Sequence, residues 1–157
     1  MSFCAELYKC KAVLLADDKT TVYGYYNCTC SGHFIDGYKI NPYTLCRNTG
    51  IKLKARYLYE GDLIEYKNAL SDWRMGFIAW DDFNKCFVIQ SSINFSSKQN
   101  IRLFDIRIIG NITLNDADLL KMQAYSDKEE KNYRPEPIVE CRSTQYLNKK
   151  AKRFLPR

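Results

Sequence analysis

The strongest constraint on the fold is a series of short strand-like segments, separated by turn residues at intervals of about ten residues. The segments are rich in Tyr, Val, Ile and Thr, which favour β-strands. Asp36-Gly37 joins Phe34-Ile35 to Tyr38 and suits a two-residue hairpin turn. The longest apolar run is residues 12–16, whereas a membrane-spanning helix needs about 20 residues. The sequence therefore predicts a mainly β fold, as a small twisted or barrel-like sheet, and no membrane association.

The middle of the chain contains further turns and one well-marked hairpin. Asn48-Thr49-Gly50 predicts a turn, and Glu60-Gly61-Asp62 predicts a turn that leads into a strand. Trp73–Trp80 and Cys86–Gln90 have the composition of two strands joined by a short loop. Gly76 lies inside the first of these strands, which indicates a bulge or a close backbone approach.

A polar segment and a β-rich segment follow this hairpin. Residues 91–100 contain four Ser, two Asn and one Lys, and they predict the longest loop of the domain. Ile101–Ile112 alternates apolar with polar residues and predicts a strand. Gly110-Asn111 indicates a bulge or bend near its end.

One short helix is predicted at residues 116–123. Asn115 suits the N-cap position, and acidic residues occupy the first turn. We expect Leu119-Leu120 and Met122 to face the sheet. The helix is therefore expected to end the β domain.

Composition changes after the predicted helix. The polar, proline-containing stretch at residues 126–137 indicates a linker. We therefore expect a β domain at residues 5–122 and a linker with a basic C-terminal extension at residues 123–157. Residues 149–157 carry five Lys or Arg and no acid, whereas the rest of the chain carries 19 basic and 18 acidic residues. The net charge of +6 thus belongs mainly to the extension.

Five ordered blocks of residues carry a resemblance to a known family. They are Tyr23-Gly24-Tyr25-Tyr26, Asn41-Pro42-Tyr43-Thr44, Thr49-Gly50, Tyr59-Glu60-Gly61-Asp62-Leu63-Ile64, and Ile108-Ile109-Gly110-Asn111-Ile112 followed by Leu119-Leu120. Over about residues 8–121 the chain resembles the YopX family of phage and prophage proteins. It departs from the family pattern at residues 51–56, where the usual Gly-containing turn is missing.

The resemblance implies a β-rich accessory protein in the cytoplasm of the bacterial host, with no known enzymatic reaction. A set of turn-forming residues is expected to be its structural signature: Gly50, Tyr59, Glu60, Gly61, Asp62, Gly110 and Asn111. In this set Gly61 permits a positive φ and Asp62 closes a turn with its carboxylate.

Cysteine chemistry offers a second hypothesis. The chain has seven Cys at irregular spacing and no recognisable export signal, which is typical of a reducing cytoplasm. Cys28, Cys30, His33 and Cys46 are ligand types for zinc, but one residue between the first two is too few for the common zinc knuckle. We expect packed thiols and neither metal nor cofactor, and zinc stays the alternative.

The sequence offers only incomplete candidates for an enzyme active site. Glu65-x-Lys67 with an upstream acid, Asp36 or Asp62, is a possible nuclease site, although an exposed strand face gives the same pattern. Cys28 or Cys30 beside His33 is a possible nucleophile pair. No glycine-rich phosphate loop or Gly-x-Ser-x-Gly motif occurs. We therefore expect a non-enzymatic protein.

Protein binding is the preferred functional prediction, because exposed aromatic and Arg side chains suit interface hot spots. The candidate partner-binding residues are Trp73, Arg74, Trp80, Arg142, Tyr146, Lys149, Lys150, Lys152 and Arg153. The partner is a host or phage protein, or a protein–nucleic-acid complex, and a counter-defence inhibitor, for example of a CRISPR nuclease, is one form of this role.

Three alternatives stay open beside protein binding. Nucleic-acid binding through the basic tail is the first, and its contacts are expected to be weak and salt-sensitive. Sequestration of a small nucleotide ligand is the second. Unpaired sheet edges also leave a homodimer open.

Overall fold

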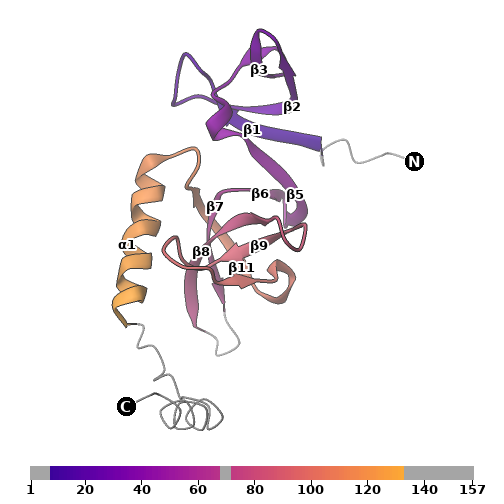
Figure 1. Ribbon diagram of the computed structural model, residues 1–157. Helices are drawn as coiled ribbons and strands as arrows, with labels where there is room; N and C mark the ends of the chain where they lie inside the picture. The colour runs from indigo at the N-terminus through magenta and orange to yellow at the C-terminus, as the bar shows by residue number, and fades with distance from the viewer. Residues whose placement is uncertain (1–7, 68–71, 133–157) are drawn as a thin grey trace, which may run out of the picture.

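The computed structural model describes residues 8–67 and 72–132 and places them in two antiparallel sheets and one helix (Figure 1). The strands are β1 (Lys9–Val13), β2 (Thr21–Thr29), β3 (Gly32–Ile35), β4 (Tyr38–Lys39), β5 (Cys46–Leu53), β6 (Arg56–Tyr59), β7 (Asp62–Lys67), β8 (Trp73–Asp81), β9 (Cys86–Gln90), β10 (Lys98–Gln99) and β11 (Ile106–Asn111). Two 3-10 turns, η2 (Pro42–Thr44) and η3 (Ile101–Leu103), and the helix α1 (Asp116–Asn132) complete the fold.

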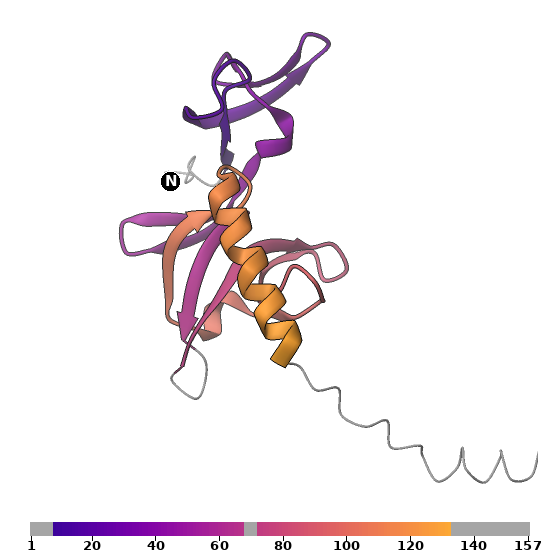
Figure 2. The same cartoon turned by 90° about the vertical axis from the view of Figure 1, so that its left-hand side faces the viewer.

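Strand order separates the chain into two parts. The first sheet has the order β4-β3-β2-β1-β5-β6, and the second has the order β10-β9-β8-β7-β11. Strands β1–β4 form a first lobe that stands away from the second sheet, and α1 runs alongside the second sheet (Figures 1 and 2). The mainly β prediction is confirmed, but the described strands form two open sheets and no closed barrel.

Each part has its own apolar core. The first lobe buries a small cluster of Ala12, Ile35 and Ile40. A larger cluster lies between the second sheet and the β5–β6 hairpin of the first: Leu58, Ile64, Tyr66, Ile78, Ile89 and Ile101. The predicted turn at Asp36-Gly37 is confirmed, because both residues have positive φ and Ile35 pairs with Tyr38 across it.

A buried polar network joins the two sheets. Lys11 of β1 forms an ion pair of 2.8 Å with Asp62 at the start of β7, and both side chains are almost fully buried. The second Asp62 oxygen accepts the Tyr59 N–H at 2.7 Å, and the Asn111 side chain donates to Asp62 at 3.0 Å. A buried charge is tolerated only when it is paired and hydrogen-bonded, so these contacts fix how the sheets meet.

Two glycines of the expected signature are required at this junction. Gly61 has a φ of 82°, and a Cβ there would lie 2.3 Å from the Thr113 Oγ1. A Cβ at Gly110 would lie 2.3 Å from a carboxylate oxygen of Asp118, whose carboxylate accepts the Asn111 N–H at 3.0 Å. The predicted bulge is confirmed between Ile108 and Gly110 in the pairing of β11 with β7.

Two expectations about the strands are wrong. Asn48-Thr49-Gly50 is an irregularity inside β5 and not a chain reversal, because the Asn48 side chain accepts the Gly50 N–H while pairing with β6 continues beyond it. The chain turns instead after Leu53, where Lys54 takes a φ of 51°. The first part of the expected strand at 101–112 is the 3-10 turn η3, since the Asn100 side chain caps it by accepting the Arg102 N–H.

The helix begins where predicted but is longer. Asn115 caps it by accepting the Ala117 N–H, and it continues to Asn132 through residues 123–132, which were expected to be linker. These residues contain no Gly or Pro, and Ser126 is buried where its hydroxyl accepts the Ile93 N–H. Met122 is buried as predicted, but Leu119-Leu120 is not, with 39% and 69% of the two residues exposed.

We predict that Asp62→Asn and Lys11→Met each lower the free energy of unfolding by about 3–5 kcal/mol, because each leaves a buried polar partner unpaired. The double variant should lose less than the sum of the two, since both changes act on one interaction. Urea unfolding of the four proteins measures this coupling, with exposed Lys39→Met as the control. Strictly additive losses would contradict the assignment.

The helix packing generates a second prediction. Met122→Ala should cost about 2–5 kcal/mol because it leaves a cavity in a buried site. Leu120→Ala should change stability by less than about 0.5 kcal/mol because that side chain is exposed. Thermal or urea unfolding of both variants distinguishes the observed helix face from one in which the two residues exchange roles.

Candidate functional site

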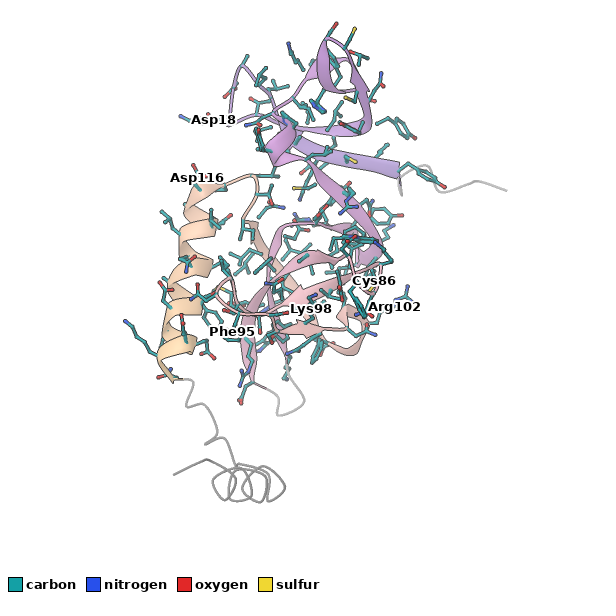
Figure 3. All side chains as sticks on the ribbon, viewed as in Figure 1. Asp18, Cys86, Phe95, Lys98, Arg102 and Asp116 are labelled. Carbon is teal, nitrogen blue, oxygen red and sulfur yellow. The ribbon has the colours of Figure 1, made fainter. Side chains whose placement is uncertain are left out.

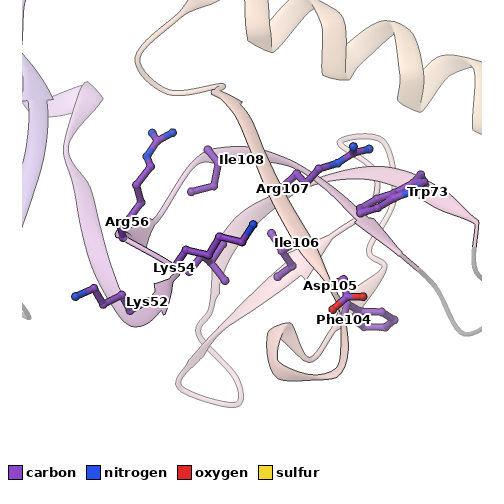
Figure 4. A pocket seen from close by; sticks show the side chains of 11 residues that line it. Lys52, Lys54, Arg56, Trp73, Phe104, Asp105, Ile106, Arg107 and Ile108 are labelled. Atoms are coloured by element: carbon purple, nitrogen blue, oxygen red, sulfur yellow. The ribbon is translucent and has the colours of Figure 1, made fainter.

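The candidate site is a groove of about 770 Å³ that runs along the outer edge of β11. One wall is the tip of the β5–β6 hairpin, residues 52–56, and the other is residues 104–108 with Trp73 (Figure 4). Figure 2 shows the hairpin projecting at the side of the second sheet next to β11. Segments far apart in sequence therefore meet at one surface.

Unpaired cations dominate the hairpin wall of this groove. Lys52, Lys54 and Arg56 are exposed, and none of them pairs with a carboxylate within residues 8–67 and 72–132. In Figure 4 the Lys54 side chain extends from the hairpin toward β11. Asp105 is the one acidic residue among those that line the groove. The groove therefore has a positive potential that favours an acidic occupant.

Trp73 and Arg107 form the aromatic part of the site. The Arg107 guanidinium lies 3.9 Å from the centre of the Trp73 ring, and it also donates to Glu65 at 2.7 Å. Trp73 is 45% exposed in spite of this contact. An Arg stacked on an exposed Trp is a rigid, amphipathic surface of the kind enriched in binding hot spots.

The floor of the groove is aliphatic. Leu53, Ile106 and Ile108 are half-buried and pack against the larger core cluster. Phe104 contributes its ring but packs edge-on against Tyr66, with 5.3 Å between ring centres. The groove thus exposes the half-buried aliphatic edge of the core, whereas the core cluster itself stays buried.

The sequence-predicted partner-binding residues are not gathered at one place. Trp73 lies in the groove, whereas Arg74 contacts Glu129 of α1 at 4.0 Å. Trp80 is at the other end of β8, roughly 23 Å away along the strand and on its opposite face. The remaining predicted residues lie outside the described part of the chain: Arg142, Tyr146, Lys149, Lys150, Lys152 and Arg153.

Trp80 belongs to a different surface feature, a hollow of about 700 Å³ beside the β8–β9 hairpin. Its ring packs edge-on against Phe87 and carries the Arg47 guanidinium at 4.9 Å. Arg47 is held in turn by two hydrogen bonds to Glu60, of 2.8 and 3.0 Å. The Arg47 guanidinium is thus engaged by a carboxylate and by two aromatic rings.

The predicted zinc ligands lie apart. Cys46 is in the buried network beside Lys11 and Asn111, and burial raises the pKa of its thiol to about 12. Cys28 is exposed on β2 opposite His33, whose Nδ1 hydrogen-bonds the Tyr26 hydroxyl at 2.6 Å. Within the described ranges, no three His, Cys, Asp or Glu side chains are close enough to hold a metal ion. The four-ligand hypothesis is therefore wrong.

The nuclease constellation is not assembled either. Asp62 is buried with both oxygens engaged in the junction, and Glu65 pairs with Arg107. Asp36 lies in the first lobe, where its carboxylate accepts the Tyr25 N–H at 3.0 Å. These carboxylates therefore do not converge on one ion.

Other surface features carry less chemistry. A hollow of about 670 Å³ between the first lobe and the start of α1 is lined mainly by polar groups, among them Asp18 and Asp116 (Figure 3). A smaller one, of about 310 Å³, lies beside Phe95 and the end of α1. Tyr23 and Tyr25 are exposed on β2, whereas Tyr59 is buried beneath the Lys11 side chain.

Comparisons with protein-family models, with curated proteins and with solved structures find no match for this chain. The described part of the chain contains no helix with the length and apolar character needed to cross a bilayer. The groove is therefore interpreted from its own residues.

Sequence reasoning missed the cations of this site. Lys52, Lys54 and Arg56 stand in a segment noted only for its missing glycine, and Arg107 was noted only as part of an alternating strand. A density of three cations within five residues was the available local signal. Whether these cations form a binding site depends on β11, which faces them across the groove and which no local sequence pattern identifies as their neighbour.

The hydrogen bonds around Asp81 give a pH prediction. The Asn84 side chain and Lys98 donate to this carboxylate and lower its pKa from 3.8 to about 2. Because the folded pKa is depressed, the stabilisation is complete above about pH 4 and is lost as pH falls toward 2. Asp81→Asn should flatten the stability profile in this window, measured by urea unfolding from pH 5 to 2. Exposed Asp82→Asn is the control, and an equal flattening there would contradict the assignment.

Proposed function

We propose that the chain is a non-enzymatic binding module that binds and modulates a macromolecule of a bacterial host or its phage. One observation carries this proposal. The groove combines three unpaired cations, an exposed Trp stacked by Arg107, and an aliphatic floor continuous with the core. Such a surface provides apolar area for affinity and charge for partner selection.

A phage or prophage origin forms the second part of the proposal. It rests on the resemblance to the YopX family over about residues 8–121, which five ordered blocks of residues carry. Counter-defence in the bacterial cytoplasm, for example inhibition of a CRISPR nuclease, is the specific role that we propose for such a module.

Nucleic-acid binding is the second candidate function. The cations at residues 52–56 favour it because they provide phosphate contacts within the domain itself, independently of the basic tail. Salt dependence and sensitivity to nuclease distinguish it from protein binding. Nucleotide sequestration is a weaker alternative, since the groove is open and Arg107 is already paired with Glu65.

The test is affinity capture from phage-infected bacterial cells, with and without nuclease, read by quantitative mass spectrometry. Lys52→Glu/Arg56→Glu should reduce the captured partner at least tenfold, because it reverses two charges of the groove. Lys121→Glu/Lys128→Glu is the matched control, since it makes the same charge change on exposed positions of α1. Equal capture by the two double variants would exclude the groove, and no partner with the unaltered chain would refute the binding function.

A further inference from the structure

We propose that the groove binds an extended acidic segment of a partner protein, which adds as a strand to the outer edge of β11. This inference rests on the proposed binding function and specifies its partner and its mode. Three features of the groove carry it: a free backbone edge, an aliphatic floor, and uncompensated positive charge.

The free edge follows from strand pairing. β11 is the last strand of the second sheet and has no partner on its outer side among the described strands. The Lys67 N–H donates to the Asp105 carbonyl at 3.0 Å, next to the pairing of Ile106 with Tyr66. Hydrogen-bonded and non-hydrogen-bonded pairs alternate in an antiparallel ladder, so Ile106 and Ile108 direct their N–H and C=O groups outward.

These outward groups are a template for another strand. Unpaired backbone groups along a sheet edge bind an extended segment by main-chain hydrogen bonds, and adjacent side-chain sites supply selectivity. The groove lies along this edge, between Ile106–Ile108 and the β5–β6 hairpin. A polypeptide placed there continues the second sheet and covers the half-buried aliphatic floor of the groove.

The floor and the walls predict the sequence pattern of the segment. Alternate side chains of a strand point to opposite faces. One set meets Leu53, Ile106 and Ile108, which favour apolar side chains. The other set lies on the face of the sheet that carries Arg107, and Lys54 and Arg56 line the same groove, so its cations favour acidic side chains. The expected segment therefore alternates apolar and acidic residues.

Charge argues against the basic end of the chain as the occupant. Residues 149–157 carry five Lys or Arg and no acid, so the cations of the groove repel them. Single-stranded nucleic acid is also a poorer fit. Its bases need free aromatic faces, whereas one face of Trp73 carries Arg107, Phe104 packs on Tyr66, and the floor is aliphatic.

The direct test uses a blocked peptide of four Val-Glu repeats with the full-length protein. An N-methylated version of the same sequence keeps the side chains and charge but removes alternate amide donors. We expect the first peptide to bind and the N-methylated one to bind at least tenfold more weakly. In the complex, amide hydrogen exchange should slow at least tenfold at Ile106 and Ile108. Lys52→Glu/Arg56→Glu should weaken binding at least tenfold, and Lys121→Glu/Lys128→Glu less than twofold.

Several outcomes would overturn strand addition. One is equal affinity for the two peptides, and another is no peptide binding at millimolar concentration. A third is tighter, groove-dependent binding of a twelve-residue oligothymidylate, which assigns the groove to nucleic acid. Concentration-dependent protection of Ile106 and Ile108 without peptide assigns the edge to a second copy. If these results occur while partner capture still depends on the groove, strand addition fails and the proposed binding function stands.

Discussion

One buried ion pair, between Lys11 of β1 and Asp62 of β7, links the two sheets in a directional way that their apolar packing does not provide. Its chemistry is demanding, because each charge has left water and must be compensated by the other and by hydrogen bonds. Tyr59 and Asn111 supply those hydrogen bonds from β6 and from the end of β11. Four strands of the two sheets are thereby held in one geometry. An apolar contact of similar area would be far less directional.

The two ends of β11 have different structural roles. At its C-terminal end, Asn111 joins the buried network, and its side-chain oxygen accepts the N–H groups of Thr113 and Leu114 to shape the turn into α1. At its N-terminal end, Ile106 and Ile108 present a free edge to the groove. The expected signature residues at this strand, Gly110 and Asn111, thus lie beside the candidate site without lining it. They hold the strand whose other end is exposed.

Local sequence patterns predicted the elements whose geometry depends mainly on adjacent residues. The Asp36-Gly37 hairpin and the Asn115 cap are of this kind, because turn and cap geometry depend on adjacent residues. Asn48-Thr49-Gly50 has similar residue types but lies inside a strand, since Thr49 donates its hydroxyl to the Leu58 carbonyl across the ladder. The prediction that Leu119-Leu120 faces the sheet was wrong, because hydrophobicity alone does not determine which helix face packs against the sheet. The buried face is the one that carries Met122 and Ser126.

The groove could not be predicted from local sequence patterns, for a related reason. Its walls, residues 52–56 and 104–108, are about fifty residues apart, and only the pairings of β5–β6 and β7–β11 bring them together. Composition placed the net positive charge in the C-terminal extension. It concealed the local excess on the hairpin, because acids elsewhere in the domain, many of them on α1, balance that excess in the total.

The position of Lys11 also limits when the first lobe can dock during synthesis. β1 and β2 leave the ribosome before β7, and these two strands can pair as soon as both have emerged. Lys11, however, must wait 51 residues for Asp62, and a further 49 residues separate Asp62 from Asn111. Until then the nascent first lobe carries a cation that burial would leave uncompensated, so it cannot dock. The first lobe is thus synthesised before β7 and β11 but can dock only after both strands have been made.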